Sequence, residues 1–181
     1  GSQRLLGAQI VGHEGVDKRI DVLATAMQAG LPVTALKDLD LAYAPPYASA
    51  KDPVNLVGFM AENLEQGVVK QFHWEDVAGL PRDGSVTLLD ARTPGEYSGG
   101  CAEGFVNVPL DELRDRLGEI APGKPVYVMC QSGLRSYLAC RILAQNGYDC
   151  YNFSGGYRFY ESVLLDRWTR QNAYPCGVER P

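Results

Sequence analysis

The chain has 181 residues, of which 45% are hydrophobic and 22% charged, and it carries a formal net charge of −5 at pH 7. This length suffices for one large hydrophobic core or two modest ones, and the composition argues against disorder. The acidic balance argues against a nucleic-acid partner, because phosphate binding requires clustered Lys and Arg. The apolar stretches are far shorter than the roughly 20 residues that cross a bilayer, so we expect no membrane segment.

Two helical patterns occupy the first 67 residues. Apolar residues recur at helical spacing from Val16 to Ala29, which predicts an amphipathic helix. A short strand is predicted from Leu39 to Tyr43. Asp52 is expected to cap a second helix that continues to Gly67. We therefore expect residues 1–67 to form a small first unit of mixed α+β structure.

After residue 67 the pattern changes to short strands that alternate with helices. We predict strands at residues 69–72, 86–90, 106–108, 126–129 and 150–153. We predict helices at residues 74–78, 94–97, 111–120 and 135–146. Such alternation is typical of the α/β class, with a central parallel sheet flanked by helices. The second unit is expected to span residues 68–170, and residues 171–181 to form a loosely held tail.

One segment of the second unit combines a strand, a cysteine and the start of a helix: Pro125 to Ser136, with the sequence PVYVMCQSGLRS. A loop between a strand and a helix N-terminus can point successive backbone NH groups into one concavity, where the helix dipole adds positive potential. Such surroundings lower the pKa of a thiol from about 8.5, and the thiolate is the nucleophile. Cys130 is therefore the candidate catalytic residue.

The residues after Cys130 complete this candidate site. Gly133 permits backbone torsions that are closed to other residues, so the loop can fold around the sulfur. Arg135, the second candidate catalytic residue, supplies a cation that can bind an anionic donor or acceptor through paired hydrogen bonds. The predicted cradle for sulfur or an anion comprises Gln131, Ser132, Gly133, Leu134, Arg135 and Ser136.

Two further residues, Asp90 and Arg92, follow the predicted strand at residues 86–90. Polar groups at the carboxyl ends of strands in open α/β sheets typically orient a site, so both are candidate supporting residues. A helix cap and a surface ion pair would explain them equally well. His73, next to Trp74, is interpreted as a packing or surface residue, with an acid or base role as the alternative.

The five cysteines are odd in number and contain no Cys-x-x-Cys pair. The sequence therefore indicates neither a complete disulfide framework nor a zinc site, and no metal is expected. A reducing cytoplasm fits this pattern. Cys140 and Cys150 are interpreted as small core residues. Cys101 is interpreted as an incidental loop residue, with a resolving thiol as the alternative.

From residue 69 to residue 168 the chain resembles the rhodanese family, in the strings CQSGLR, LLDARTPGEY, GFVNVPLDEL and FSGGYRFY. The resemblance implies that Cys130 attacks a sulfane sulfur, carries it as Cys–S–SH and passes it to a thiol or cyanide-like acceptor. CoA persulfide, polysulfide and thiosulfate are the implied donors. No metal is implied.

Loop length distinguishes two chemistries in folds of this kind. Sulfur carriers have four residues between the cysteine and the arginine, as this chain has, whereas related phosphatases have one more and a wider cup. The chain departs from many rhodaneses at residues 101–104, where Cys-Ala-Glu-Gly replaces a His-Ile-Pro-Gly turn. The rigidity of that turn and the contribution of its histidine are therefore not expected here.

The first unit has a second resemblance, in GAQIVGHEGVDKRIDVLATAMQAG and LDLAYAPPYASAKDPVN. These strings resemble the later part of the dimerisation domain of flavoprotein disulfide reductases, closest to the CoA-disulfide reductase type. The resemblance implies a C-terminal fragment, a homodimer through the first unit, and FAD, NAD(P)H and CoA as cofactors of the full-length parent, with none bound by the fragment. It also implies substrate-binding roles for Tyr43, Tyr47 and Lys51, for which packing at a dimer seam is the alternative.

The sequence thus predicts a sulfurtransferase domain attached to part of a CoA-disulfide, CoA-persulfide or polysulfide reductase. The fragment alone is not expected to carry out the flavin reduction. Two alternatives stay open: a dimerisation or substrate-docking module without turnover, and a phosphatase-like cysteine loop.

Overall fold

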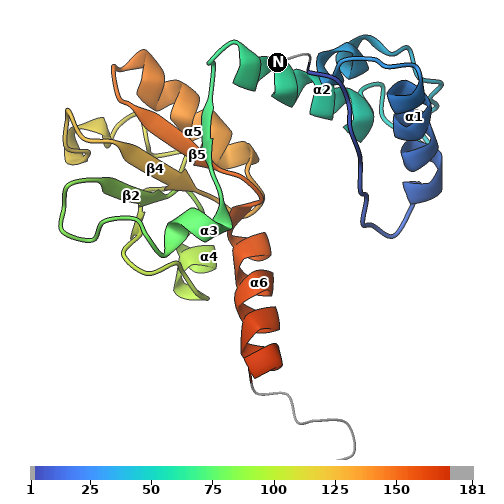
Figure 1. Cartoon of the computed structure of the whole chain (residues 1–181). Coiled ribbons are helices and arrows are strands. Elements are labelled where there is room, and N and C mark those ends of the chain that lie inside the picture. The colour runs from blue at the N-terminus through green and yellow to red at the C-terminus, as the bar shows by residue number, and fades with distance from the viewer. Residues whose placement is uncertain (1–2, 172–181) are drawn as a thin grey trace, which may run out of the picture. The chain divides into compact units, whose positions relative to one another are not determined.

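A computed structural model describes residues 3–171 of the protein (Figure 1). The chain divides between Val68 and Val69 into two compact units. Of the tail predicted at residues 171–181, the part from residue 172 onward lies outside the described residues. No helix in the described range is both long and apolar enough to span a membrane.

The first unit contains the helix α1 (Val16–Gln28), the 3-10 helix η1 (Val33–Asp38) and the helix α2 (Pro53–Glu65). Asp52 caps α2, because its carboxylate accepts a hydrogen bond from the Val54 amide at 3.0 Å. Buried apolar side chains from the three helices form the core of this unit: Leu23, Ala26, Leu36 and Val54.

The strand predicted from Leu39 to Tyr43 is wrong, since these residues have no regular structure. The buried side chain of Asn55 in α2 donates to the carbonyl oxygens of Leu36 and Leu39 at 3.0 and 2.9 Å. These two hydrogen bonds hold the end of η1 and the residue after it against α2.

The second unit is built on a five-stranded sheet. Its strands are β1 (Lys70–Phe72), β2 (Thr87–Asp90), β3 (Val106–Asn107), β4 (Val126–Met129) and β5 (Cys150–Phe153). They lie in the order β1-β5-β4-β2-β3, and every pair is parallel. The predicted fold class, a central parallel sheet flanked by helices, is confirmed.

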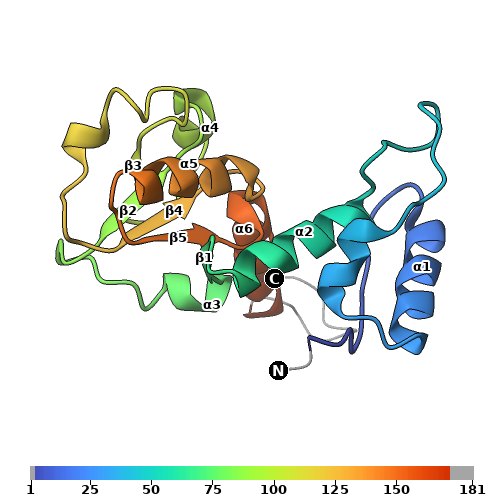
Figure 2. The same ribbon diagram turned by 90° about the horizontal axis from the view of Figure 1, so that it is seen from above.

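Helices cover both faces of this sheet. They are α3 (Trp74–Val77), α4 (Pro94–Ser98), α5 (Leu134–Gln145) and α6 (Gly156–Gln171). Figure 2 shows α5 and α3 on opposite sides of the sheet, and each lies in its own core cluster. Leu143 of α5 packs with Val128 in one cluster, and Val77 of α3 packs with Phe153 in the other.

The helix predicted at residues 111–120 is largely wrong. Only Leu117–Glu119 is helical, as the short 3-10 helix η2. The preceding residues form turns with hydrogen bonds between residues three apart, including Leu113 N to the Leu110 carbonyl at 3.2 Å. The fully buried side chain of Leu113 belongs to the core cluster beneath the turns, so tertiary packing overrides the local helical preference.

Parallel strands bring the residues that follow them to one edge of the sheet. β2, β4 and β5 end at Asp90, Met129 and Phe153, and they are neighbours in the sheet. Cys130, Asp90 and the start of α6 therefore meet at this edge, where open α/β sheets commonly place their sites.

Candidate functional site

Cys130 lies directly after β4, at the base of a loop that leads into α5. The backbone amide of Gly133 donates a hydrogen bond to its Sγ at 3.1 Å, and the hydroxyl of Ser136 lies 3.2 Å from the same atom. Gly133 has a φ of 108°, which a side chain would disfavour. Glycine at this position therefore lets the loop turn back over the sulfur.

The sulfur is buried beneath this loop. Cys130 is 1% exposed, whereas Leu134 at the start of α5 is 66% exposed. Several loop amides are expected to face the sulfur, and the amide of Gly133 donates a hydrogen bond to Sγ. A sulfur donor that presents a single sulfur atom to Sγ would displace the loop backbone less than a bulky group would.

The N-terminus of α6 fixes the loop from its other side. The amides of Tyr157 and Arg158 donate to the carbonyl oxygens of Cys130 and Gln131 at 2.7 and 3.2 Å. A Cβ placed on Gly156 would lie 2.5 Å from the Gln131 backbone. This approach explains the second glycine of FSGGYRFY, and sequence reasoning did not anticipate the contact.

Asp90 and Arg92 form a buried ion pair next to the loop. Nη2 of Arg92 donates to Asp90 at 2.7 Å, and both side chains are at most 2% exposed. The same guanidinium donates to the Gln131 side chain at 3.3 Å and lies 4.0 Å from the centre of the Tyr157 ring. The pair therefore braces the loop from within, and the surface ion pair that the sequence left open is not what the structure contains.

Arg135 forms an ion pair with a residue that the sequence reasoning missed. Its Nη1 and Nη2 donate to the two carboxylate oxygens of Glu96 in α4, at 2.7 and 2.6 Å. Hydrogen bonding to Arg135 is the main cause that lowers the pKa of Glu96 to about 2. Thr93 and Glu96 have the spacing of a capping box, which predicts a helix start but gives no sign of the pairing with Arg135.

Two other cysteines lie in the core under α5. Cys140 and Cys150 are buried in the same cluster as Cys130, and the Cys150 thiol donates to the Cys140 carbonyl at 3.1 Å. The Cys150 thiol and burial together raise the pKa of Cys140 well above its usual range. Cys101 is exposed and forms no disulfide with another described cysteine. No group of three or more metal-binding side chains occurs in the part of the chain that the structure describes.

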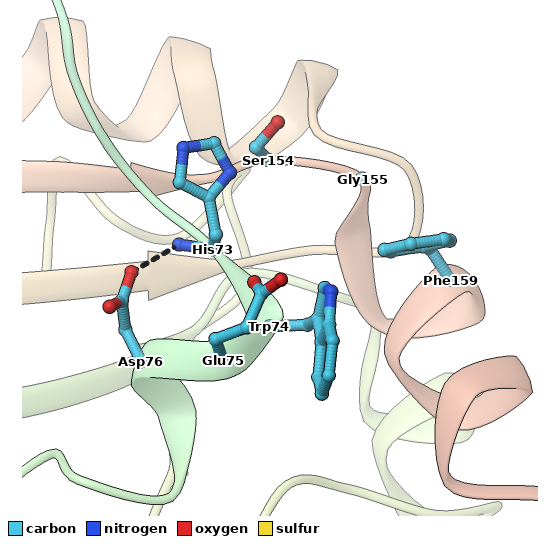
Figure 3. A pocket seen from close by; sticks show the side chains of 7 residues that line it. All are labelled: His73, Trp74, Glu75, Asp76, Ser154, Gly155 and Phe159. Carbon is cyan, nitrogen blue, oxygen red and sulfur yellow. Dashed lines mark hydrogen bonds between the residues drawn. The ribbon is translucent and has the colours of Figure 1, made fainter. Parts of the chain in front are cut away.

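His73 lies at the start of α3, and its amide donates to the Asp76 carboxylate at 2.7 Å. Its side chain lines an open groove of about 690 Å³ at the ends of β1 and β5. Figure 3 shows the residues that surround this groove: His73, Trp74, Glu75, Asp76, Ser154, Gly155 and Phe159.

Tyr43, Tyr47 and Lys51 belong to the first unit, whereas the Cys130 loop belongs to the second. Both tyrosines are exposed, at 57% and 87%. The Lys51 ammonium lies 5.1 Å from the centre of the Phe59 ring, a cation–π contact within the unit.

Comparison with known proteins identifies the family of the second unit. Residues 73–162 match the family model of the rhodanese-like domain. The crystal structure of reduced Bacillus anthracis CoADR-RHD is 48% identical with a TM-score of 0.81, and the match covers 85% of this chain and 28% of that one. A NAD-dependent persulfide reductase from A. fulgidus is 41% identical with a TM-score of 0.74, over 88% of this chain and 28% of that one. Both matches cover more of the chain than the second unit, which begins at Val69, so they extend into the first unit.

Curated proteins match shorter stretches. A coenzyme A disulfide reductase of Staphylococcus haemolyticus is 49% identical over 35% of this chain and 14% of its own length. The uncharacterized protein YqhL of Bacillus subtilis is 43% identical over 39% of this chain and 57% of its own length. The chain thus spans a minor part of the reductases that it matches.

Proposed function

Residues 73–162 form a rhodanese-like domain, and we propose that it transfers sulfur through a persulfide on Cys130. The observation that carries this proposal is the Cys130 sulfur itself, which has the Gly133 amide and the Ser136 hydroxyl within 3.2 Å. Both groups can donate to a thiolate, and the N-terminus of the 12-residue helix α5 adds favourable potential there. Cys130 is the proposed catalytic residue. Arg135, which the sequence also predicts to be catalytic, is paired with Glu96, and the loop between Cys130 and Arg135 cradles the sulfur.

The first half-reaction moves one sulfur atom. The Cys130 thiolate attacks the outer sulfur of the donor and forms a new S–S bond. The donor's own S–S bond breaks, and its electron pair leaves on a thiolate, or on sulfite when thiosulfate is the donor. In the second half-reaction an acceptor thiolate attacks the outer sulfur of Cys–S–SH and restores the Cys130 thiolate. Electrons balance in each step without a further oxidant or reductant.

The loop geometry favours this reaction over phosphate chemistry. Four residues separate Cys130 from Arg135, and Cys130 is almost completely buried beneath them. A single sulfur atom adds little volume above Sγ, whereas a phosphoryl group carries three oxygens that need space and donors of their own.

We further propose that the chain works as part of a longer reductase in a reducing cytoplasm. This proposal is supported by the likeness to CoADR-RHD and to a persulfide reductase named as NAD-dependent. In such a parent, the first unit would contribute to a homodimer, and Tyr43, Tyr47 and Lys51 would contact a CoA thiol or persulfide. The sequence has no GxGxxG fingerprint for a dinucleotide, so FAD and NAD(P)H would be bound elsewhere in the parent, and we assign no flavin step to this chain.

Persulfide formation tests the proposal. After incubation with thiosulfate or CoA persulfide, the intact mass of the protein should increase by one sulfur atom. The Cys130→Ser variant should gain no sulfur, and Cys101→Ser should gain it as the wild type does. An undiminished adduct in Cys130→Ser would remove Cys130 from this role.

The burial of Cys130 supports a second candidate function, because a buried thiol is less accessible to a sulfur donor. In this second function the chain is a docking module that positions substrate without turnover. Thiosulfate:cyanide transfer and solution mass, measured together, separate the two functions. A dimer with an unreactive Cys130 would support the docking module and contradict sulfur transfer.

A further inference from the structure

We propose that Glu96 is a specificity-determining residue: by occupying Arg135, it makes the Cys130 loop select thiol persulfides, whose reacting end carries no oxyanion group, over thiosulfate, whose sulfonate oxygens would need Arg135. This names the substrate class of the same site, and it rests on the proposed sulfur transfer.

The Glu96 carboxylate uses the two groups of Arg135 that would bind an oxyanion. Nη1 and Nη2 donate to separate carboxylate oxygens at 2.7 and 2.6 Å. This parallel pairing is the geometry in which guanidinium groups also bind the oxygens of sulfonates and phosphates. Thiosulfate would therefore have to compete with Glu96 for the same donors.

Glu96 is held in place independently of Arg135. The amide and the hydroxyl of Thr93 donate to its Oε2 at 3.0 and 2.9 Å. The carboxylate belongs to the capping box at the start of α4. Its position is therefore built into the helix, and it differs from a loose surface ion pair, whose side chains separate readily.

The second arginine beside the loop is neutralised in the same way. Arg92 is paired with Asp90, and both are buried. The guanidinium groups of Arg92 and Arg135 are thus each paired with a carboxylate. These two arginines therefore add little net positive charge to the loop. Arg158 at the start of α6 is exposed, and its amide donates to the Gln131 carbonyl.

Glu96 remains charged near neutral pH. Because Arg135 and Thr93 lower the pKa of Glu96 to about 2, protonation does not release Arg135 near neutral pH. The site therefore favours a donor whose reacting end carries no oxyanion group, such as the persulfide of a thiol. Such a donor needs only the Gly133 amide and the Ser136 hydroxyl at the reacting sulfurs.

Replacing Glu96 tests the proposal directly. Glu96→Gln keeps the shape but removes the charge, and we expect the kcat/KM ratio of thiosulfate to glutathione persulfide to rise about tenfold. Glu96→Asp keeps the charge and should leave the ratio close to that of the wild type. Glu119→Gln is the matched control, because Glu119 pairs with Arg116 on an exposed surface of η2. An unchanged or lowered ratio in Glu96→Gln would overturn the proposal.

Alkylation provides a readout that does not depend on sulfur transfer. In a Cys101→Ser background, the rate of Cys130 modification by anionic iodoacetate is compared with that by neutral iodoacetamide, using the mass of the Cys130 peptide. Glu96→Gln should raise the iodoacetate to iodoacetamide ratio by a similar factor. An unaltered ratio in a protein that still forms the persulfide would contradict the role of Glu96 alone. A raised ratio without any persulfide would instead contradict the proposed function.

The wild type alone also tests the preference, should Glu96→Gln fail to fold. We expect at least about a tenfold larger kcat/KM for glutathione persulfide than for thiosulfate. Equal use of both donors would overturn the proposal.

Discussion

The hydroxyl of Ser136 lies between two acceptors, 3.2 Å from the Cys130 sulfur and 3.1 Å from the Gly133 carbonyl oxygen. A hydroxyl has one proton to donate. We infer that this proton turns to the sulfur when Cys130 is a thiolate and returns to the carbonyl when the sulfur carries less charge.

Ser136→Ala should therefore slow persulfide formation. A hydrogen bond to a charged group contributes about 1.5 to 3 kcal/mol, which corresponds to a loss of roughly tenfold or more in rate. Single-turnover mass spectrometry with a persulfide donor measures this rate. Ser162→Ala is the control, since the Ser162 hydroxyl donates to the Arg158 carbonyl within α6. Equal rates in the two variants would exclude the hydroxyl from the reaction.

Gly156→Ala should both destabilise the domain and disturb the loop. The new Cβ would lie 2.5 Å from the Gln131 backbone at a φ of 71°, so one of the two segments must move. We expect a loss of about 2 kcal/mol or more in unfolding free energy. Gly147→Ala has a similar φ of 82° with open space around the Cβ, so it should lose about 1 kcal/mol. Urea unfolding compares the two, and equal losses would mean that contact with the loop contributes nothing.

Asp90→Asn should be strongly destabilising. The substitution leaves the Arg92 charge buried without its counterion, which typically costs about 3 kcal/mol or more. Asp149→Asn breaks the Lys70–Asp149 pair, whose side chains are about half exposed, and should cost at most about 1 kcal/mol. Chemical denaturation of both variants measures the difference. A small loss in Asp90→Asn would contradict the view that this pair braces the loop.

The Glu96–Arg135 pair should make stability depend on acid pH. The folded-state pKa of Glu96 is lowered from 4.5 to about 2, so the pair contributes its stability above pH 4.5 and loses it as the pH falls toward 2. The unfolding free energy of the wild type should exceed that of Glu96→Gln near pH 6, and the two should converge near pH 2. A difference that stays constant across this range would contradict the pairing.

The candidate loop around Cys130 could be predicted from the sequence because its information is local. A strand, Cys130, Gly133 and a helix start are consecutive, and the parallel α/β fold follows from the alternation of short elements. The partners of the loop come from distant segments. Glu96 lies 39 residues before Arg135, and no periodicity or spacing connects the two.

The two incorrect secondary-structure predictions have a related physical cause. The Leu39 carbonyl is bound by the Asn55 side chain, and the residues around Leu113 form turns that bury that leucine. In both cases a tertiary contact outweighed a local preference. The degree to which Cys130 is buried could not be inferred either, because it depends on how α6 packs against the loop.

The most direct measurement is to locate the transferred sulfur by peptide mass spectrometry. The protein is treated with a thiol persulfide, alkylated under non-reducing conditions, and digested. We predict that the peptide containing Cys130 carries one extra sulfur between the cysteine and the alkyl group. Extra sulfur found on Cys101 instead, or on no cysteine, would contradict the assignment of Cys130 as the sulfur carrier.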